Sequence, residues 1–176
     1  MELTELIKSR RSIGAVDEKE IPEKIIKELL DIAVWAPNHK KTEPWKFRVF
    51  TGESRIKLGK EMAQIAKEKY AELNEDELKQ KVEKAEKGPL RAPAIIALAV
   101  SPSGKVPEIE EIVACGCVLE NFLLAAEEKG LATIVRTGDI VHDPALKPYL
   151  KLEENDKVIG LIYLGYPKKD FDIKAV

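Results

Sequence analysis

Ala36-Pro37-Asn38-His39-Lys40-Lys41-Thr42-Glu43-Pro44-Trp45 separates a predicted helix from a predicted strand. An apolar helix ends at the first proline, and a strand over residues 46–51 begins after the tryptophan. The loop between the two prolines gathers a histidine and two lysines. Loops that are rich in donors and held between rigid elements are where proteins bind ligands. This segment therefore predicts a binding loop.

The residues before this loop predict a pair of helices. Apolar residues recur at helical spacing from Ile25 to Val34, after a proline in the first turn, and residues 3–10 form a shorter amphipathic helix. Arg10-Arg11-Ser12 ends the shorter helix and offers two guanidinium groups, a hydroxyl and backbone donors, the chemistry that a phosphate requires. The helix dipole also favours cations at this end without any ligand, so spacing alone leaves both interpretations open.

Beyond the loop, helices and strands follow in an order that predicts an α+β fold. A charged helical region spans residues 54–86, and its later part is expected at the surface. The helix at 108–129 is apolar almost all round over residues 112–126 and needs cover on every side, which is easiest if another subunit packs on it. Three apolar runs predict strands, at residues 94–100, 131–137 and 158–163. Residues 144–150, between the last two strands, predict a short helix.

Length and composition exclude several classes of protein. At 176 residues the chain is expected to form one domain, residues 1–176. Its 29 Lys and Arg nearly cancel its 31 Asp and Glu, and the net charge of −2 gives no reason to expect a nucleic-acid partner. No apolar run reaches the roughly 18 residues that cross a membrane, and no signal-peptide pattern occurs. The protein is therefore expected off the membrane, in the cytoplasm.

No metal site is expected. His39 has no second histidine or cysteine nearby, and neither HExxH nor a paired-carboxylate spacing occurs. Cys115 and Cys117 point to different faces of a helix, which favours small buried residues over a zinc site or a disulfide. The chain also lacks GxGxxG and GxxxxGK[ST], which excludes Rossmann and P-loop nucleotide sites.

Six segments together resemble the FMN-dependent nitroreductase family, in particular its short YdjA-like subgroup. They follow the family's order over almost the whole chain, which makes the set far more specific than any one member. They are Arg10-Arg11-Ser12, Ala36 to Trp45, Arg91-Ala92-Pro93, Lys105-Val106-Pro107, Arg136-Thr137-Gly138 and Asp156 to Pro167.

The resemblance implies a fold and an activity. The fold is α+β, with a central, mostly antiparallel sheet flanked by helices, in a homodimer with FMN at the subunit interface. The activity is that of an enzyme, an oxidoreductase in which NAD(P)H reduces the flavin and the flavin reduces a small-molecule acceptor such as a nitroaromatic or a quinone. The flavin carries this chemistry, so no catalytic residue is named. The alternative is an FMN-binding carrier, or a flavin-fold protein without dedicated turnover.

The resemblance also implies roles for individual residues. Arg10, Arg11 and Ser12 belong to the FMN site, where the first arginine and the serine hold the ribityl phosphate. His39 contacts the FMN of the partner subunit, and Trp35 stands where a relative carries an FMN-contacting arginine. The remaining FMN contacts are Val135, Arg136 and Thr137, and the NAD(P) region is Ala125, Ala126, Glu127, Glu128, Lys129 and Gly130.

Two residues of the loop depart from the family's pattern. The wider family commonly has Gln before Pro-Trp and an Asn in the loop, whereas this chain has Glu43 and Lys41. These exchanges alter the charge near the cofactor's edge. Alternatively, the two side chains pair with each other in solvent, where such a pair contributes about 0–1 kcal/mol.

Overall fold

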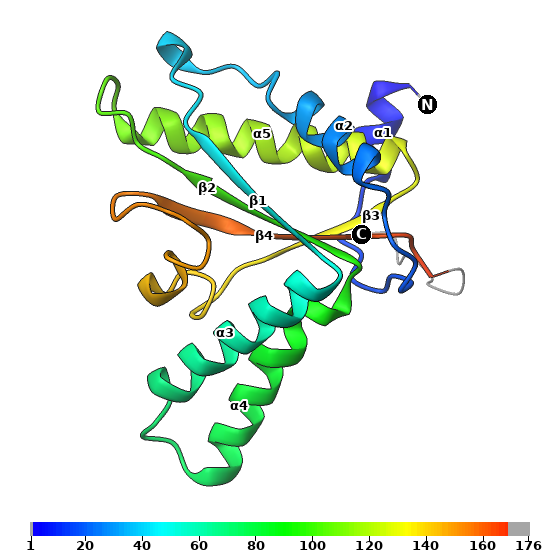
Figure 1. Cartoon of the computed structure of the whole chain (residues 1–176). Coiled ribbons are helices and arrows are strands. Elements are labelled where there is room, and N and C mark those ends of the chain that lie inside the picture. The colour runs from blue at the N-terminus through cyan, green and yellow to red at the C-terminus, as the bar shows by residue number, and fades with distance from the viewer. Residues whose placement is uncertain (1, 169–176) are drawn as a thin grey trace.

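The computed structural model describes residues 2–168 and contains a four-stranded sheet in the order β1-β2-β4-β3 (Figure 1). All neighbouring strands are antiparallel. The strands are β1 (Trp45–Thr51), β2 (Ala94–Val100), β3 (Ala132–Arg136) and β4 (Lys157–Gly165). This confirms the predicted α+β class and the antiparallel sheet, with strand boundaries within two residues of those expected.

Helices cover both faces of the sheet (Figure 1). The long helix α5 (Glu108–Glu128) and α2 (Glu23–Ala33) pack on one face, and α1 (Leu3–Ser9) lies against the second half of α5. The hairpin of α3 (Glu53–Lys69) and α4 (Glu75–Lys87) packs on the other face and projects beyond the sheet. Short 3-10 turns complete the described elements: η1 (His39–Lys41), η2 (Gly88–Arg91) and η3 (Pro144–Leu146).

The sheet divides the core in two, because successive side chains of a strand point to opposite faces. In β2, Ile96 packs with Leu29 and Phe122 under α2 and α5. Its neighbour Ile95 packs with Leu58 on the α3 side. All seven residues of β2 are buried, as an unbroken apolar run between two layers of helices predicts.

The charged region at 54–86 forms two helices where one continuous helical region was expected. A turn at residues 70–74 interrupts it, and Asn74 starts α4 by accepting a hydrogen bond from the Glu77 backbone at 3.0 Å. Gly59 brings the two helices close together, because a Cβ there would lie 2.2 Å from the Glu86 carbonyl oxygen. The later part of the region is largely exposed, as predicted, with Ala85 the buried residue of α4.

Two other helical predictions need adjustment. The apolar periodicity before Pro37 predicts a helix to the loop, yet α2 ends at Ala33, and the next residues form a turn closed by hydrogen bonds to Ile32 and Ala33. The helix expected at 144–150 is reduced to η3, because Asp143 caps a single 3-10 turn between two prolines.

Helix α5 is covered on one side only. Its residues Val118 and Phe122 are fully buried against the sheet and α2, while Ile109 and Val113 on the opposite stripe are 64% and 59% exposed. The neighbouring helices extend this surface. We call the exposed set the outer apolar face: Leu3, Ile7, Ile32, Trp35, Ile109 and Val113. Apolar patches of this kind mark interaction surfaces in soluble proteins.

Candidate functional site

The segment after α1 joins the outer edge of the sheet. Ser12 forms a parallel bridge with Thr133 of β3, and the Ile13 backbone donates to the Thr133 carbonyl at 2.8 Å. The structure thereby brings two of the predicted FMN-contact segments together, one beginning at Arg10 and one ending β3. Ser12 itself is exposed, so its hydroxyl faces solvent at this edge.

Arg136 lies over the same segment. Its Nη2 atom is 3.3 Å from the position that a Cβ on Gly14 would occupy, so a side chain at Gly14 would crowd the guanidinium. Arg136 is exposed and has no ion pair among residues 2–168. Sequence reasoning missed Gly14, since a lone glycine in a loop carries no signal of the side chain packed on it.

The two N-terminal arginines have different roles. Arg11 folds back on α1, where its Nη1 donates to the carbonyls of Lys8 at 2.6 Å and Arg10 at 2.9 Å. It thus satisfies carbonyls at the helix end, as the dipole interpretation predicts. Arg10 is half-buried, and its one ion pair in the described chain, to Glu120, is long at 3.9 Å. Arg10 therefore keeps most of its donors for another acceptor.

Val135 and Thr137 flank Arg136 with different exposure. Val135 is half-buried and packs into the core under α5, so only its backbone faces the edge of the sheet. Thr137 is exposed and begins the loop after β3. The arrangement of Arg10, Ser12, Arg136 and Thr137 gives one edge of the sheet an excess of donors and positive charge, which suits an anion.

The His39 loop, residues 38–44, has an unusual backbone. Lys40, Lys41 and Glu43 all have positive φ, at 53°, 51° and 45°, although none is a glycine. Such residues cost of order 1–3 kcal/mol each and persist where surrounding contacts impose them. Here the Glu43 backbone donates to Asn38 Oδ1 at 3.0 Å. The proposed pairing of Lys41 with Glu43 is absent from the ion pairs of the described residues.

Contacts to the first turn of α5 hold this loop in place. His39 Nδ1 lies 2.6 Å from Glu110 Oε2, and Lys40 Nζ donates to the Lys105 carbonyl at 3.3 Å. Glu111 is buried and accepts from the Ser103 backbone at 2.9 Å, which fixes the segment that carries Lys105. Burial raises the pKa of Glu111, but hydrogen bonds, chiefly from Ser103, together with the nearby charge of Lys105 leave the pKa below its usual value. These acids are distant from the loop in sequence, so no local pattern announces them.

We call Arg10, Ser12, Arg136 and Thr137 the Arg10 edge. Within one chain, the His39 loop lies apart from the Arg10 end of this set. Arg10 pairs with Glu120 and His39 with Glu110, and these two acids are ten positions apart, which corresponds to about 15 Å along α5. One chain therefore does not bring His39 to its own Arg10. This separation accords with the implied role of His39 at the partner's site, which stays a prediction.

Trp35 is 87% exposed and lies on the outer apolar face. It lines a surface cavity of about 300 Å³ together with Leu3, Ile32 and Leu124. No residue of the Arg10 edge lines that cavity. Within one chain, Trp35 is therefore placed to contact another molecule rather than the local donors.

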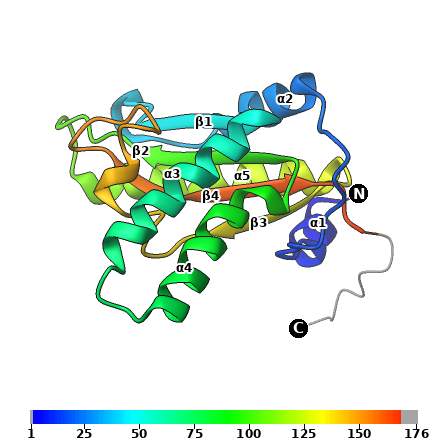
Figure 2. The same cartoon turned by 60° about the horizontal axis from the view of Figure 1, so that its bottom comes forward.

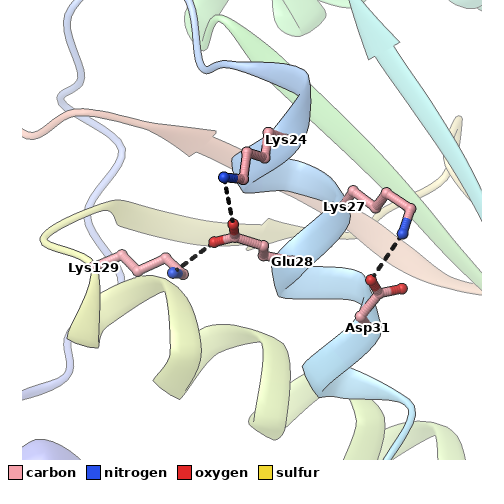
Figure 3. A network of polar contacts seen from close by, with 5 residues as sticks. All are labelled: Lys24, Lys27, Glu28, Asp31 and Lys129. Carbon is pink, nitrogen blue, oxygen red and sulfur yellow. Dashed lines mark hydrogen bonds and ion pairs between the residues drawn. The ribbon is translucent and has the colours of Figure 1, made fainter.

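Most residues of the predicted nicotinamide segment pack in the core or form contacts within the chain. Ala125 and Ala126 are buried in the core, Glu127 is half-buried, and Glu128 is exposed. Lys129 donates to Glu28 at 2.9 Å, in a network with Lys24 beside the Lys27–Asp31 pair (Figure 3). The Lys129 hydrogen bond lowers the pKa of Glu28. Gly130 turns the chain into β3 with a φ of +70°. The role of this segment stays a prediction.

Residues 2–168 contain neither a membrane-spanning helix nor a cluster of metal ligands. No helix in this part of the chain is both long and apolar enough to cross a membrane. Within the same range, no three His, Cys, Asp or Glu side chains gather as metal ligands would.

The chain is similar to known nitroreductases in sequence and in structure. YdjA of Escherichia coli strain K12, named as an NAD(P)H nitroreductase, is 31% identical over 170 residues, 96% of this chain and 90% of that protein. A nitroreductase-like protein from Bacillus cereus superposes with a TM-score of 0.85 at 27% identity, covering all of this chain and 91% of the other. A Bacteroides fragilis nitroreductase with bound FMN gives 0.74 at 25% identity, covering 99% and 92%.

The family model described as "Nitroreductase family" matches residues 7–166, from the last turns of α1 to the end of β4. That range includes the Arg10 edge and the His39 loop. The resemblance of the six segments is thus confirmed, and the chain belongs to the nitroreductase family.

Proposed function

We propose that the chain is an FMN-dependent NAD(P)H oxidoreductase that reduces a small acceptor such as a nitroaromatic or a quinone. The observation that carries this proposal is that the segment following Arg10 joins β3 through the Ser12–Thr133 bridge, and that Arg136 at the end of β3 lies over Gly14 of the same segment. The relatives support it, since YdjA is named for an NAD(P)H activity and the Bacteroides fragilis structure contains FMN.

The residues present fit the phosphate end of FMN. A phosphate monoester needs cationic donors and hydroxyls, and this edge offers the loosely paired guanidinium of Arg10 and the exposed Ser12. Arg11 is less available, because its Nη1 is engaged by two carbonyls. In this proposal Arg10 and Ser12 hold the phosphate, and Arg11 keeps the end of α1 in place.

The strand end would orient the rest of the cofactor. The Arg136 guanidinium and the backbone of Thr137 lie where β3 leaves the sheet, so they can donate to the polar edge of a flat ring. When bound, FMN supplies the redox chemistry, accepting a hydride from NAD(P)H and giving it to the acceptor. The chain's own groups bind and orient, and none of them serves as acid, base or nucleophile in this proposal.

The His39 loop completes the site from the second subunit. Its strained backbone and its contacts to α5 keep His39 in one position. The outer apolar face provides the surface on which two chains would pack. The proposal therefore includes a homodimer with one FMN at each of two shared sites.

An anaerobic absorbance spectrum tests the function. We expect the protein to purify yellow, to release FMN on heating, and to be bleached by NADH or NADPH and restored by a nitroaromatic or a quinone. A yellow protein that neither nicotinamide bleaches would be a flavin carrier. A colourless protein that does not take up added FMN would overturn the proposal.

A further inference from the structure

A second cavity lies between the α3–α4 hairpin and the segment that follows β3. It has a volume of about 390 Å³, within the range of small-molecule sites. Arg136 and Thr137 line one side, and Lys81 and Lys84 of α4 line the other. The hairpin projects past the sheet on this face (Figure 2), so α4 forms an outer wall. The cavity thus adjoins the proposed flavin contacts Arg136 and Thr137 and reaches across to α4.

The lining of this cavity carries an excess of positive charge. Its cations are Lys81, Lys84, Arg91 and Arg136, and none of them has an ion pair among the residues that the structure describes. The one carboxylate in the lining, Asp139, accepts a hydrogen bond from Tyr70 at 3.2 Å. The chain as a whole has a net charge of −2, so this local excess is not a consequence of composition.

Two other lysines on the same hairpin have carboxylate partners. Lys69 pairs with Asp143 at 2.9 Å, and Lys87 pairs with Glu83 at 3.1 Å. Lys81 instead lies over the ring of Tyr70, 5.0 Å from its centroid. Lys84 likewise has no ion pair among the described residues, so both lysines that line the cavity keep their charge available to a ligand.

The cavity also has an aromatic and a hydroxyl component. Tyr163 is 6% exposed, and its hydroxyl lies 3.6 Å from the position of a Cβ on Gly88, where no side chain covers it. Burial raises the pKa of Tyr163, against the opposing charges of Arg136 and Arg91, so the hydroxyl keeps its proton and can donate. Tyr70, Met62 and Ile140 add apolar wall. Flat apolar walls with several cations suit an aromatic molecule that bears a carboxylate.

We propose that this cavity, which we call the hairpin cavity, binds the carboxylate end of an aromatic electron acceptor, with Lys81 and Lys84 as its specificity residues. The inference rests on the proposed function, since the acceptor would extend from the flavin contacts at Arg136 toward α4. Both lysines are exposed on one helix face and three residues apart, so both can reach one carboxylate.

A matched pair of nitroaromatics tests this inference. para-Nitrobenzoate and para-nitrobenzamide share ring, nitro group and size, and differ in charge at one end. Calorimetry on the flavin-loaded, oxidised protein without NAD(P)H measures the binding of each, and steady-state assays give kcat/KM for both. We expect the benzoate to be favoured, and each of Lys81→Gln and Lys84→Gln to lower its affinity and kcat/KM roughly three- to tenfold. The amide should be little affected.

Lys79→Gln is the control, because it removes the same charge from an exposed site of α4 that does not line the cavity. We expect it to leave the preference for the benzoate unchanged. Added salt should weaken the binding of the benzoate alone.

Three outcomes would overturn the inference. Equal binding of acid and amide to the unmodified protein would do so, as would an equal effect of Lys79→Gln. A parallel loss of FMN affinity and of both acceptors in Lys81→Gln and Lys84→Gln would show that these cations serve the flavin. A protein that binds no FMN refutes the proposed function instead, and the calorimetric comparison on that protein still decides the charge preference of the cavity.

Discussion

Arg10 and Arg11 are adjacent and chemically identical, yet the structure gives them different surroundings. Arg11 donates to two carbonyls of α1, while Arg10 has only a long contact to Glu120. The difference arises because the chain leaves α1 at Arg10 and continues toward β3, where Ser12 pairs with Thr133. The neighbours of each guanidinium therefore decide whether its donors are left for a ligand.

The first prediction concerns Arg10. Arg10→Ala should weaken FMN binding by roughly ten- to a hundredfold, because it removes one or two charge-assisted hydrogen bonds of about 1.5–3 kcal/mol each. Fluorescence titration of flavin-free protein with FMN measures this. Lys8→Ala removes an exposed cation from the same helix and should leave the affinity within twofold, about the effect of a surface charge. An unchanged affinity in Arg10→Ala would reduce Arg10 to a helix-end cation.

The second prediction concerns the pH dependence of stability through Asp156. This carboxylate is 1% exposed and accepts from Lys46 Nζ at 2.6 Å and from the Glu153 backbone at 2.8 Å. Burial raises its pKa, but these hydrogen bonds outweigh burial and the pKa is lowered in the folded state. Its stabilising effect is thus complete above the unfolded pKa of about 3.9 and is lost as pH falls through the folded value.

Urea unfolding of the flavin-free protein near neutral pH and near about pH 3 checks this. Asp156→Asn should lower the free energy of unfolding by about 1–3 kcal/mol near neutrality, because it replaces the buried, charged acceptor of Lys46 and of the Glu153 backbone by a neutral amide. The deficit should shrink in acid, because Asp156 takes up a proton in the unfolded chain before it does so in the folded chain. A deficit of constant size at both pH values would mean that the charge of Asp156 does not matter.

Among the elements, the α3–α4 hairpin depends on close contact between two helices. Gly59 allows this contact, and an alanine there would meet the Glu86 carbonyl. Gly59→Ala should lower the free energy of unfolding by about 1–3 kcal/mol, as overpacking does, and lower Tm by about 2–4 °C for each of those kcal/mol. Differential scanning calorimetry measures it. Ala63→Gly is the control for helix propensity, since it lies one turn later and is expected to destabilise by no more than about 1 kcal/mol.

Sequence patterns predicted these elements unevenly. The strand at 94–100 and the helix at 108–129 were located because their apolar periodicities are long and unmixed. The break at 70–74 was missed, because Lys and Glu continue across it and only Asn74 marks the new helix start. Short-range patterns see one helix at a time, so they could not show that Glu86 lies against Gly59.

The candidate site shows the same limit. The Arg10 and Arg136 segments were identified through the family resemblance, and the structure brings both to one edge of the sheet. The contact of His39 with Glu110 crosses 71 positions of sequence and could not be predicted. The hairpin cavity was missed for a similar reason, since Lys81 and Lys84 form part of an ordinary charged helix until the fold brings Arg136 opposite them.

At the scale of the whole molecule, the outer apolar face predicts a homodimer. Light scattering should give about twice the chain's 19.7 kDa. Val113→Glu should shift the protein toward the monomer and lower flavin occupancy together, because the proposed site takes His39 from the partner. Ile56→Glu places the same charge at an exposed apolar position on α3, across the sheet, and should leave the dimer intact. A flavin-loaded monomer for the unmodified protein would contradict the shared site.

The positive φ angles at Lys40, Lys41 and Glu43 have a consequence for how the protein tolerates sequence change. Glycine at Lys41 would relieve about 1–2 kcal/mol of backbone strain and lose about 0.5–1 kcal/mol to unfolded-chain entropy, so Lys41→Gly should raise the free energy of unfolding slightly. The same exchange should weaken FMN binding, because a freer loop presents His39 in more orientations. In this one variant, the free energy of unfolding measured in urea should rise while the affinity for FMN measured by titration falls. Selection for thermal stability alone should therefore favour glycine at these positions. Laboratory evolution toward heat resistance should then lower FMN affinity through substitutions in this loop.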